Sequence, residues 1–330
     1  MRIVIAPDGF KGSLGADRAA EAIARGWRAV RSEDELVLIP QADGGEGTLA
    51  AMQRARPDAV LREVDGVTGP DGRPRTGVWL DLGDGTAVVE LAAVAGIELM
   101  GTLDPLGATS RGLGEVMAAA LDAGAQRLVI GIGGSASTDA GRPVLDALAG
   151  RPVPLGGAVV LSDVRAPLLG PTGAAAVFGP QKGATPDIVL ALEERLAQAC
   201  AGSRVDPSTP GAGAAGGVGF ALLEWGATIL EGAQEIGRLS GLEAAAATAD
   251  LVITGEGRFD EQSLVGKVVG AVIALGAPAV IIAGSIAVPA PVPSFSLVHL
   301  AGSVEGAMSE PERWLEVAGA AVGRAVGSSM

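Results

Sequence analysis

The feature that most constrains the fold is a repeated order of short apolar strand, polar loop and helix. Near the start, Arg2 to Ala6 is a short β-branched run, Pro7 to Gly15 is a loop, and Ala16 to Val30 has apolar residues at helical spacing. Glu35 to Ile39 begins the same order again, and a second glycine-rich loop, Gln41 to Thr48, follows it. This repetition is typical of a doubly wound α/β sheet.

The same order returns near the end of the chain. Ala249 to Thr254 predicts a strand, Gly255 to Gln262 a loop, and Ser263 to Leu275 a helix. Ala279 to Ala283 and Phe295 to Leu300 predict two more strands. Ligands of open α/β sheets bind outside the carboxyl ends of the strands. We therefore expect the polar loops that follow these strands to form a site.

The middle of the chain has a different pattern. Gly77 to Leu82 and Thr86 to Leu91 flank a Gly-Asp-Gly turn, which predicts a hairpin. Gly112 to Ala123 predicts a helix, Arg127 to Ile132 a strand, and Gly211 to Gly219 a glycine-rich turn that opens a helix. Hairpin and helices together favour a second α/β or α+β domain.

This change of pattern predicts two domains. We expect residues 1–67 and 246–330 to form one α/β domain, and residues 68–245 to form a second domain inserted into it. A chain of 330 residues is long enough for two ordinary domains.

Composition excludes several classes of protein. The chain has 24 Lys and Arg against 38 Asp and Glu, a net charge of −14, so it does not resemble a nucleic-acid-binding protein. A single cysteine forms no internal disulfide, and one cysteine with one histidine makes no Cys/His metal cluster. The uncharged stretch from Val268 to Val304 is interrupted by Gly and Pro, and the first residues lack the features of a signal peptide. We expect a cytoplasmic protein with no membrane partner.

Lysine is scarce in this chain. Only Lys11, Lys182 and Lys267 occur among the 24 basic residues, and all the others are arginine. Lysine is a compact point charge on a flexible stem, whereas arginine is a planar fork. Phosphate sites often use such a point charge. The simpler interpretation is that the scarcity of lysine reflects chance and codon usage.

Acidic residues gather in the glycine-rich loops. They are Asp8, Asp43, Glu46, Asp139, Asp163, Glu256 and Asp260. For a single loop acid, turn capping is the simpler interpretation. Where such carboxylates lie near Lys11 and Lys267, the carboxylates are suited to bind Mg²⁺ and the lysines to bind phosphate. The chain has one histidine, His299, which lies in an apolar run, and one cysteine, so neither a histidine base nor a cysteine nucleophile is expected. A carboxylate is then the remaining common choice of general base.

Two partial matches to the dinucleotide fingerprint G-x-G-x-x-G/A keep an alternative open. One is Gly131, Gly133 and Ala136, and the other runs from Gly211 through Gly213 to Gly216. Neither has the complete strand, glycines, helix and acid of that fold. They indicate, weakly, an NAD-dependent oxidoreductase acting on a hydroxy acid.

Six segments together resemble the bacterial glycerate kinases of the first type over nearly the whole chain. They are APDGFKGSLGA at 6–16, ADGGEGT at 42–48, GIGGSASTDAG at 131–141, DVRAPLLGPTGAAAVFGPQKGA at 163–184, GAGAAGGVG at 211–219 and TGEGRFDEQSLVGK at 254–267. The chain departs from the family at Gly9, where a serine is common, and at Thr138 to Gly141, where Asn-Asp-Gly-Gly is common. The stretch between Gly141 and Asp163 is also shorter than usual. All three lysines fall inside the six segments.

The resemblance implies a discontinuous flavodoxin-like domain built from both chain ends, an inserted α/β domain, and an active site in the cleft between them. It implies ATP-dependent phosphorylation of D-glycerate with Mg²⁺. We lean to 2-phosphoglycerate as the product, with 3-phosphoglycerate, a related hydroxy acid as substrate, or a non-catalytic metabolite sensor as alternatives. A homodimer is compatible with the sequence.

On this basis we hypothesise a role for each candidate residue. The hydroxyl would be oriented or deprotonated by Asp139, with Asp8 and Asp43 as competing candidates, and Lys11 would contact the glycerate carboxylate or the transferring phosphate. The substrate would be bound by Ser13, Arg258, Asp260, Gln262 and Lys267. The nucleotide phosphates would be bound by Gly133, Gly134, Ser135, Lys182, Gly213 and Gly216. Mg²⁺ would be held by Asp43, Glu46 and Glu256.

Overall fold

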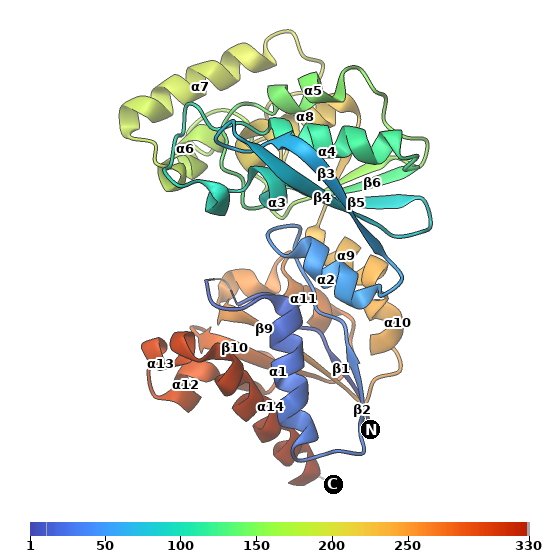
Figure 1. Ribbon diagram of the computed structural model, residues 1–330. Helices are drawn as coiled ribbons and strands as arrows, with labels where there is room; N and C mark the ends of the chain where they lie inside the picture. Colours follow the sequence, from blue (N-terminus) through green and yellow to red (C-terminus); the bar gives the residue numbers. More distant parts are fainter. Residues whose placement is uncertain (11, 329–330) are drawn as a thin grey trace. The chain divides into compact units, whose positions relative to one another are not determined.

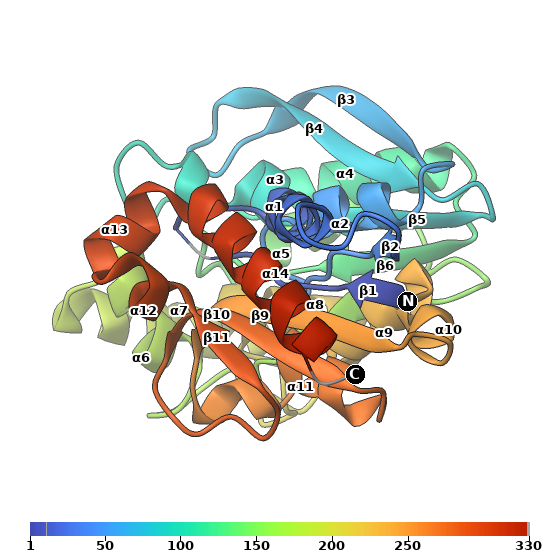
Figure 2. The same cartoon turned by 90° about the horizontal axis from the view of Figure 1, so that it is seen from below.

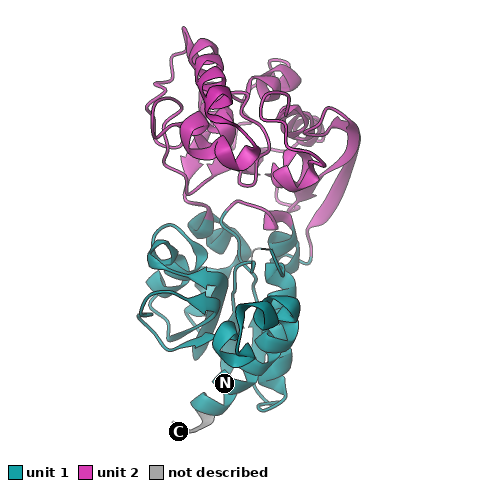
Figure 3. Ribbon diagram, turned by 90° about the vertical axis from the view of Figure 1, so that its left-hand side faces the viewer, with its two compact units in different colours: residues 1–43, 50–57, 233–330 teal, residues 44–49, 58–232 magenta. Residues whose placement is uncertain are grey.

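The computed structural model describes residues 1–10 and 12–328, and it divides into two compact units (Figure 3). Unit 1 consists of residues 1–43, 50–57 and 233–330, and unit 2 consists of residues 44–49 and 58–232. Both units combine strands and helices (Figure 1), which confirms the predicted α/β class. The domain boundaries expected from the sequence stay a prediction.

Unit 1 is built on a parallel sheet. Its strands in the described residues are β1 (Arg2–Ile5), β2 (Glu35–Leu38), β9 (Leu251–Phe259), β10 (Ala279–Ile286) and β11 (Ser294–Ser296). They pair in the order β11-β10-β9-β1-β2. The chain therefore leaves β1 toward one edge and returns at β9 on the other side of β1, so the order reverses between β1 and β9.

Helices cover both faces of this sheet (Figure 2). The helical elements are α1 (Ala16–Arg28), α9 (Gly232–Ser240), α10 (Leu242–Ala246), η4 (Glu261–Leu264), α11 (Val268–Ala274), α12 (Leu297–Ala301), α13 (Val304–Ser309) and α14 (Pro311–Ser328). In β1, Ile3 and Ile5 pack with α1 and α14, whereas Val4 packs with α10 and α11. Burial on both faces explains why β1 is apolar at the three consecutive positions after Arg2 rather than at alternate ones.

Unit 2 is built on a mixed sheet. Its strands in the described part of the chain are β3 (Val60–Thr68), β4 (Pro74–Asp81), β5 (Thr86–Glu90), β6 (Arg127–Gly131), β7 (Ala158–Leu161) and β8 (Thr228–Leu230). They pair in numerical order, antiparallel from β3 to β5 and parallel from β5 to β8. The predicted hairpin around the Gly-Asp-Gly turn is confirmed as β4 and β5.

Helices and short turns complete unit 2. They are α3 (Ala92–Ala95), η1 (Ile97–Leu99), α4 (Arg111–Asp122), α5 (Arg142–Leu148), α6 (Ala174–Phe178), η2 (Pro180–Lys182), α7 (Pro186–Cys200), η3 (Ala214–Gly217) and α8 (Val218–Trp225). The main core joins residues of β5 and β6 to residues of α4, α5 and α8. Helix α2 (Thr48–Ala55) lies across the division of the chain into units.

Three predictions near the C-terminal end are wrong in detail. The loop expected from Gly255 is a continuation of β9 to Phe259, because β10 pairs with it over this length. The helix expected from Ser263 starts at Val268, after the short turn η4. The strand expected at Phe295–Leu300 ends at Ser296, whose hydroxyl accepts a hydrogen bond from the His299 N–H and so begins α12.

The described helices do not include one that is both long and apolar enough to cross a membrane.

Candidate functional site

Unit 1 has a pocket of about 320 Å³ at the carboxyl ends of β1, β9 and β10. It lies where the strand order reverses between β1 and β9, which is the usual ligand position in a doubly wound sheet. Residues far apart in the sequence meet there. The polar and charged side chains in its lining belong to Asp8, Ser13, Asp43, Glu256, Arg258, Asp260, Lys267 and Ser285.

The loop after β1 is held by its own backbone and by β9. The Asp8 N–H donates to the carbonyl of Gly255 at 2.8 Å, and the Ser13 hydroxyl donates to the carbonyl of Phe10 at 2.8 Å. Phe10 is buried in the core that α1 and α14 share. Asp8 and Ser13 are thereby held in the lining of the pocket. Lys11 lies outside the described residues.

The end of β9 places two charged residues in the same pocket. Glu256 and Arg258 lie two positions apart on the strand, so they project to the same side. Glu256 is 7% exposed, whereas the Arg258 side chain is largely exposed, with Nε 3.6 Å from Asp260 Oδ2. A Cβ at Gly255 would lie 1.9 Å from the Ile282 carbonyl oxygen, so the close approach of β9 to β10 requires glycine at this position.

The segment after β9 is fixed by a reciprocal cap. Asp260 Oδ1 accepts a hydrogen bond from the Gln262 N–H at 3.0 Å, and Ser263 Oγ accepts one from the Asp260 N–H at 2.9 Å. Lys267 sits at the N-terminal cap position of α11 and lines the pocket. Among the residues predicted to bind substrate, Gln262 is exposed and does not line it.

Part of the unit 1 pocket lining is an apolar wall, which was not predicted from the sequence. It is formed by α12, α13 and the start of α14, through Leu297, Val298, Val304, Ala307, Met308 and Pro311. Val304 and Met308 are 58% and 55% exposed, respectively. One sequence feature could have predicted this wall. Val304, Ala307 and Met308 are apolar and recur at helical spacing.

A buried carboxylate holds the glycine-rich loop of residues 44–49 in unit 2. Glu90, at the end of β5, accepts hydrogen bonds from the N–H groups of Gly47 at 3.0 Å and Leu49 at 2.8 Å. Burial raises the pKa of Glu90, and these backbone hydrogen bonds oppose that rise. Glu46 is exposed on this loop. Sequence analysis did not single out Glu90, because it reads as the last residue of a strand.

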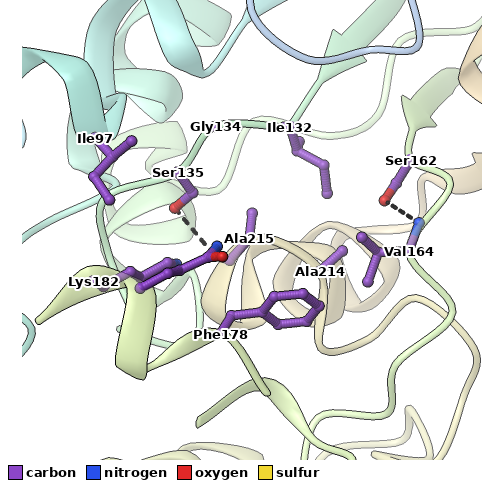
Figure 4. Close-up of a pocket in the computed structure, with 12 residues that line it drawn as sticks. Ile97, Ile132, Gly134, Ser135, Ser162, Val164, Phe178, Lys182, Ala214 and Ala215 are labelled. Atoms are coloured by element: carbon purple, nitrogen blue, oxygen red, sulfur yellow. Dashed lines mark hydrogen bonds between the residues drawn. The ribbon is translucent and has the colours of Figure 1, made fainter. Parts of the chain in front are cut away.

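Unit 2 has a second, smaller pocket of about 140 Å³ (Figure 4). The loop after β6 contributes Gly133, Gly134 and Ser135, and η2 contributes Lys182. A Cβ at Gly133 would lie 2.5 Å from the Cα of Gly45, so the two glycine-rich loops pack backbone against backbone. Four residues expected to bind phosphate are therefore gathered at one pocket.

Lys182 is almost completely buried, at 3% exposure, and its ammonium donates to the backbone carbonyl of Ser137. Desolvation lowers its pKa to about 8, and the negative charge of Asp139 opposes that shift.

Asp139 is also buried, with both carboxylate oxygens in use. Its Oδ2 accepts from the Ser110 N–H at 2.7 Å and its Oδ1 accepts from the Gly141 N–H at 3.0 Å. The Ser110 hydroxyl donates to the same carboxylate at 2.8 Å. The carboxylate thus fastens the turn between β6 and α5 to the start of α4.

Gly213 and Gly216 serve close packing. A Cβ would lie 2.1 Å from the Pro167 carbonyl oxygen at Gly213, and 2.1 Å from the Ser137 carbonyl oxygen at Gly216. Ala214 and Ala215, between them, line the pocket instead. No strand directly precedes these glycines in the described chain, and the dinucleotide fingerprint requires one.

Three comparisons decide the family. A profile described as the Glycerate kinase family matches residues 3–157 and 156–327. The chain belongs to the glycerate kinase family. This confirms the resemblance and the expectation of an enzyme.

Curated relatives agree with this assignment. A glycerate kinase of Bacillus subtilis is 42% identical over 87% of this chain and 85% of its own length. A glycerate 2-kinase of Escherichia coli is 40% identical over 81% of this chain and 80% of its own length. A crystal structure of a putative glycerate kinase 2 from Salmonella typhimurium is 34% identical and aligns with a TM-score of 0.80, over 100% of this chain and 99% of that one.

Proposed function

We propose that this chain catalyses the ATP-dependent phosphorylation of D-glycerate. The observation that carries the proposal is the unit 1 pocket, which in a chain of this family gathers carboxylates and cations from loops distant in sequence. Asp8, Asp43 and Glu256 meet Arg258 and Lys267 there. Phosphoryl transfer depends on positioning and charge neutralisation more than on covalent chemistry by the protein, and this pocket offers both.

In the proposed reaction, a hydroxyl oxygen of glycerate bonds to the γ-phosphorus while the bond from that phosphorus to the bridging oxygen of ADP breaks. The hydroxyl proton passes to a carboxylate. We propose Asp8 or Asp43 for this role rather than Asp139, because both line the unit 1 pocket, whereas Asp139 is buried and lines neither pocket. We propose that Asp139 positions its loop. Because the E. coli relative is named glycerate 2-kinase, we propose 2-phosphoglycerate as the product, with 3-phosphoglycerate as the alternative.

Mg²⁺ fits the carboxylates of the unit 1 pocket. Mg²⁺ prefers carboxylate oxygens and is commonly held by one or two of them together with substrate phosphates. We propose that Asp43 and Glu256, which both line this pocket, would hold the ion, whereas Glu46 belongs to the unit 2 loop. No group of three His, Cys, Asp or Glu side chains that could hold a metal ion occurs among residues 1–10 and 12–328. Bound Mg²⁺ would neutralise charge on the β- and γ-phosphates.

The strand order of unit 1 supports the finer fold proposal. Numbered within the unit, β2-β1-β9-β10-β11 is the order 2-1-3-4-5, which flavodoxin-like sheets share. We propose that unit 1 is the discontinuous flavodoxin-like domain and unit 2 the inserted one.

The test is a coupled assay of ADP release with purified protein, ATP, Mg²⁺ and D-glycerate. We expect ADP release that depends on D-glycerate, and a strong loss of kcat/KM in Glu256→Gln. Glu261→Gln is the matched control, because Glu261 is a nearby exposed carboxylate outside the pocket. Release of ADP at the same rate without D-glycerate, or equal activity of the two variants, would contradict the proposal.

A further inference from the structure

The two pockets differ in size, and the difference bears on which substrate each one takes. The unit 2 pocket has about 140 Å³, and the unit 1 pocket has about 320 Å³. D-Glycerate is a three-carbon acid, whereas ATP carries a base, a ribose and three phosphates. Pockets for ligands of nucleotide size start at about 300 Å³. Size alone therefore matches the small pocket to the acceptor and the large pocket to the nucleotide.

The charges of the two pockets favour the same match. Of the described residues that line the unit 2 pocket, none is acidic, and Lys182 supplies a buried cation. An ammonium has three N–H donors, of which one is given to the Ser137 carbonyl. A small carboxylate would find a desolvated positive charge there. The Asp139 carboxylate, whose negative charge reaches Lys182, lies outside the pocket lining and accepts the N–H groups of Ser110 and Gly141. A charge-assisted hydrogen bond from the ammonium to the small carboxylate is about twice as strong as a neutral one.

Further polar groups of the unit 2 pocket suit a hydroxy acid (Figure 4). Ser162 accepts a hydrogen bond from the Val164 N–H at 3.2 Å, which leaves its own hydroxyl hydrogen to donate. The Ser135 hydroxyl oxygen accepts a hydrogen bond from the Ser137 N–H at 3.2 Å, but as a donor to carbonyls the hydroxyl makes only long contacts, at 3.4 Å to those of Ser137 and Ala215. The hydrogen bonds of the described residues leave the backbone N–H groups of Gly134 and Ser135 without an acceptor. These donors can meet the carboxylate and hydroxyls of a small acid.

The unit 1 pocket is unsuited to a bare carboxylate and suited to a nucleotide. Four carboxylates in its described lining, those of Asp8, Asp43, Glu256 and Asp260, outnumber the two cations there, Arg258 and Lys267, so the lining would repel a bare organic acid. These carboxylates would repel a nucleotide less strongly, because its phosphates bind together with a divalent cation that offsets their negative charge. The apolar wall of α12 and α13 has little to contact in glycerate, whose only C–H groups are one CH and one CH₂, each bearing a hydroxyl. A flat purine base would cover the exposed Val304 and Met308 side chains.

We propose that the unit 2 pocket binds the acceptor, with the Lys182 ammonium on its carboxylate, and that the unit 1 pocket binds the nucleotide, with its base against Val304 and Met308. This assignment rests on the proposed function, and it reverses the allocation hypothesised from the sequence.

The test measures binding of ADP with Mg²⁺ and of D-glycerate separately, by isothermal titration of the full chain. Lys182→Met should weaken D-glycerate binding by about 10- to 100-fold and leave ADP binding within about twofold. Met308→Glu should do the opposite, because it places a carboxylate against the base. Gln198→Met and Val317→Glu introduce the same side chains at exposed positions of units 2 and 1 outside both pockets, and they should change neither affinity.

The outcomes separate the two proposals. Wild-type protein that releases no D-glycerate-dependent ADP contradicts the proposed function. Active wild-type protein in which Lys182→Met weakens ADP binding and spares D-glycerate overturns the assignment alone, as does a Met308→Glu variant that selectively loses D-glycerate. Far-UV circular dichroism checks that each variant is folded. Ser135→Ala is a second variant of the same pocket, and it should also weaken D-glycerate selectively.

Discussion

Replacing Lys182 by Met should stabilise the unliganded protein at neutral pH. The pKa of Lys182 is lowered from 10.5 to about 8 by burial, and at roughly 1.4 kcal/mol per unit this corresponds to a cost of about 3 kcal/mol for keeping the buried ammonium charged. Methionine removes that cost but leaves the Ser137 carbonyl without its donor, which costs about 1 kcal/mol. The net expectation at pH 7 is a gain of about 2 kcal/mol.

The gain should disappear as the pH rises. Between about pH 8 and 10.5 the unfolded chain binds the Lys182 proton and the folded chain does not. Wild-type stability therefore rises with pH over this interval, whereas that of the Met variant has no such contribution. The difference between the two proteins should shrink from pH 8 upward and change sign near pH 10.

Thermal unfolding at pH 7, 8, 9 and 10, followed by tryptophan fluorescence, measures this difference. Trp79 and Trp225 report on unit 2, and Gln181→Met is the control for introducing methionine next to the buried site. The reasoning is refuted if Lys182→Met lowers the melting temperature at pH 7, or if its effect is the same at every pH. A stabilised variant with impaired glycerate binding would identify Lys182 as a residue kept for function at the expense of stability.

Four further substitutions have defined expectations. Glu90→Ala removes two hydrogen bonds from the residue 44–49 loop and should lower unfolding free energy by about 2–4 kcal/mol; calorimetry that finds no change would show that the loop does not depend on this carboxylate. Gly133→Ala should displace the facing loop and abolish most activity, whereas Gly101→Ala, with open space around its Cβ, should be neutral in the same coupled assay. Lys267→Arg should reduce kcat/KM if a point charge is needed, and wild-type kinetics would mean that charge alone suffices. Lys11→Ala should lose most of kcat/KM while the protein still folds, and full activity would remove Lys11 from the mechanism.

The local sequence pattern was sufficient to predict the elements in which buried residues are continuous or alternate regularly. β1 and the hairpin of β4 and β5 lie within a residue or a few residues of their predicted positions, because continuous or alternating burial is written directly into the sequence. The local pattern was insufficient where pairing with a strand distant in the sequence determines the secondary structure. The polar stretch after Thr254 reads as a loop, yet pairing with β10 keeps it in the sheet to Phe259.

The candidate site was predictable as a set of loops but not as two pockets. The scarcity of lysine drew attention to Lys182, but its burial depends on packing around η2 that no local pattern describes. The short apolar run at Phe295 could have been strand or helix, since periodicity alone does not distinguish them over that length. Its helical outcome is part of what builds the apolar wall.

The most direct test of the account is ³¹P NMR of a reaction containing purified protein, ATP, Mg²⁺ and D-glycerate. We expect a new phosphomonoester resonance that increases in parallel with the ADP resonances and coincides with that of added 2-phospho-D-glycerate. A resonance that coincides with 3-phosphoglycerate would correct the position of transfer. ATP that stays intact in the presence of D-glycerate would contradict the central claim.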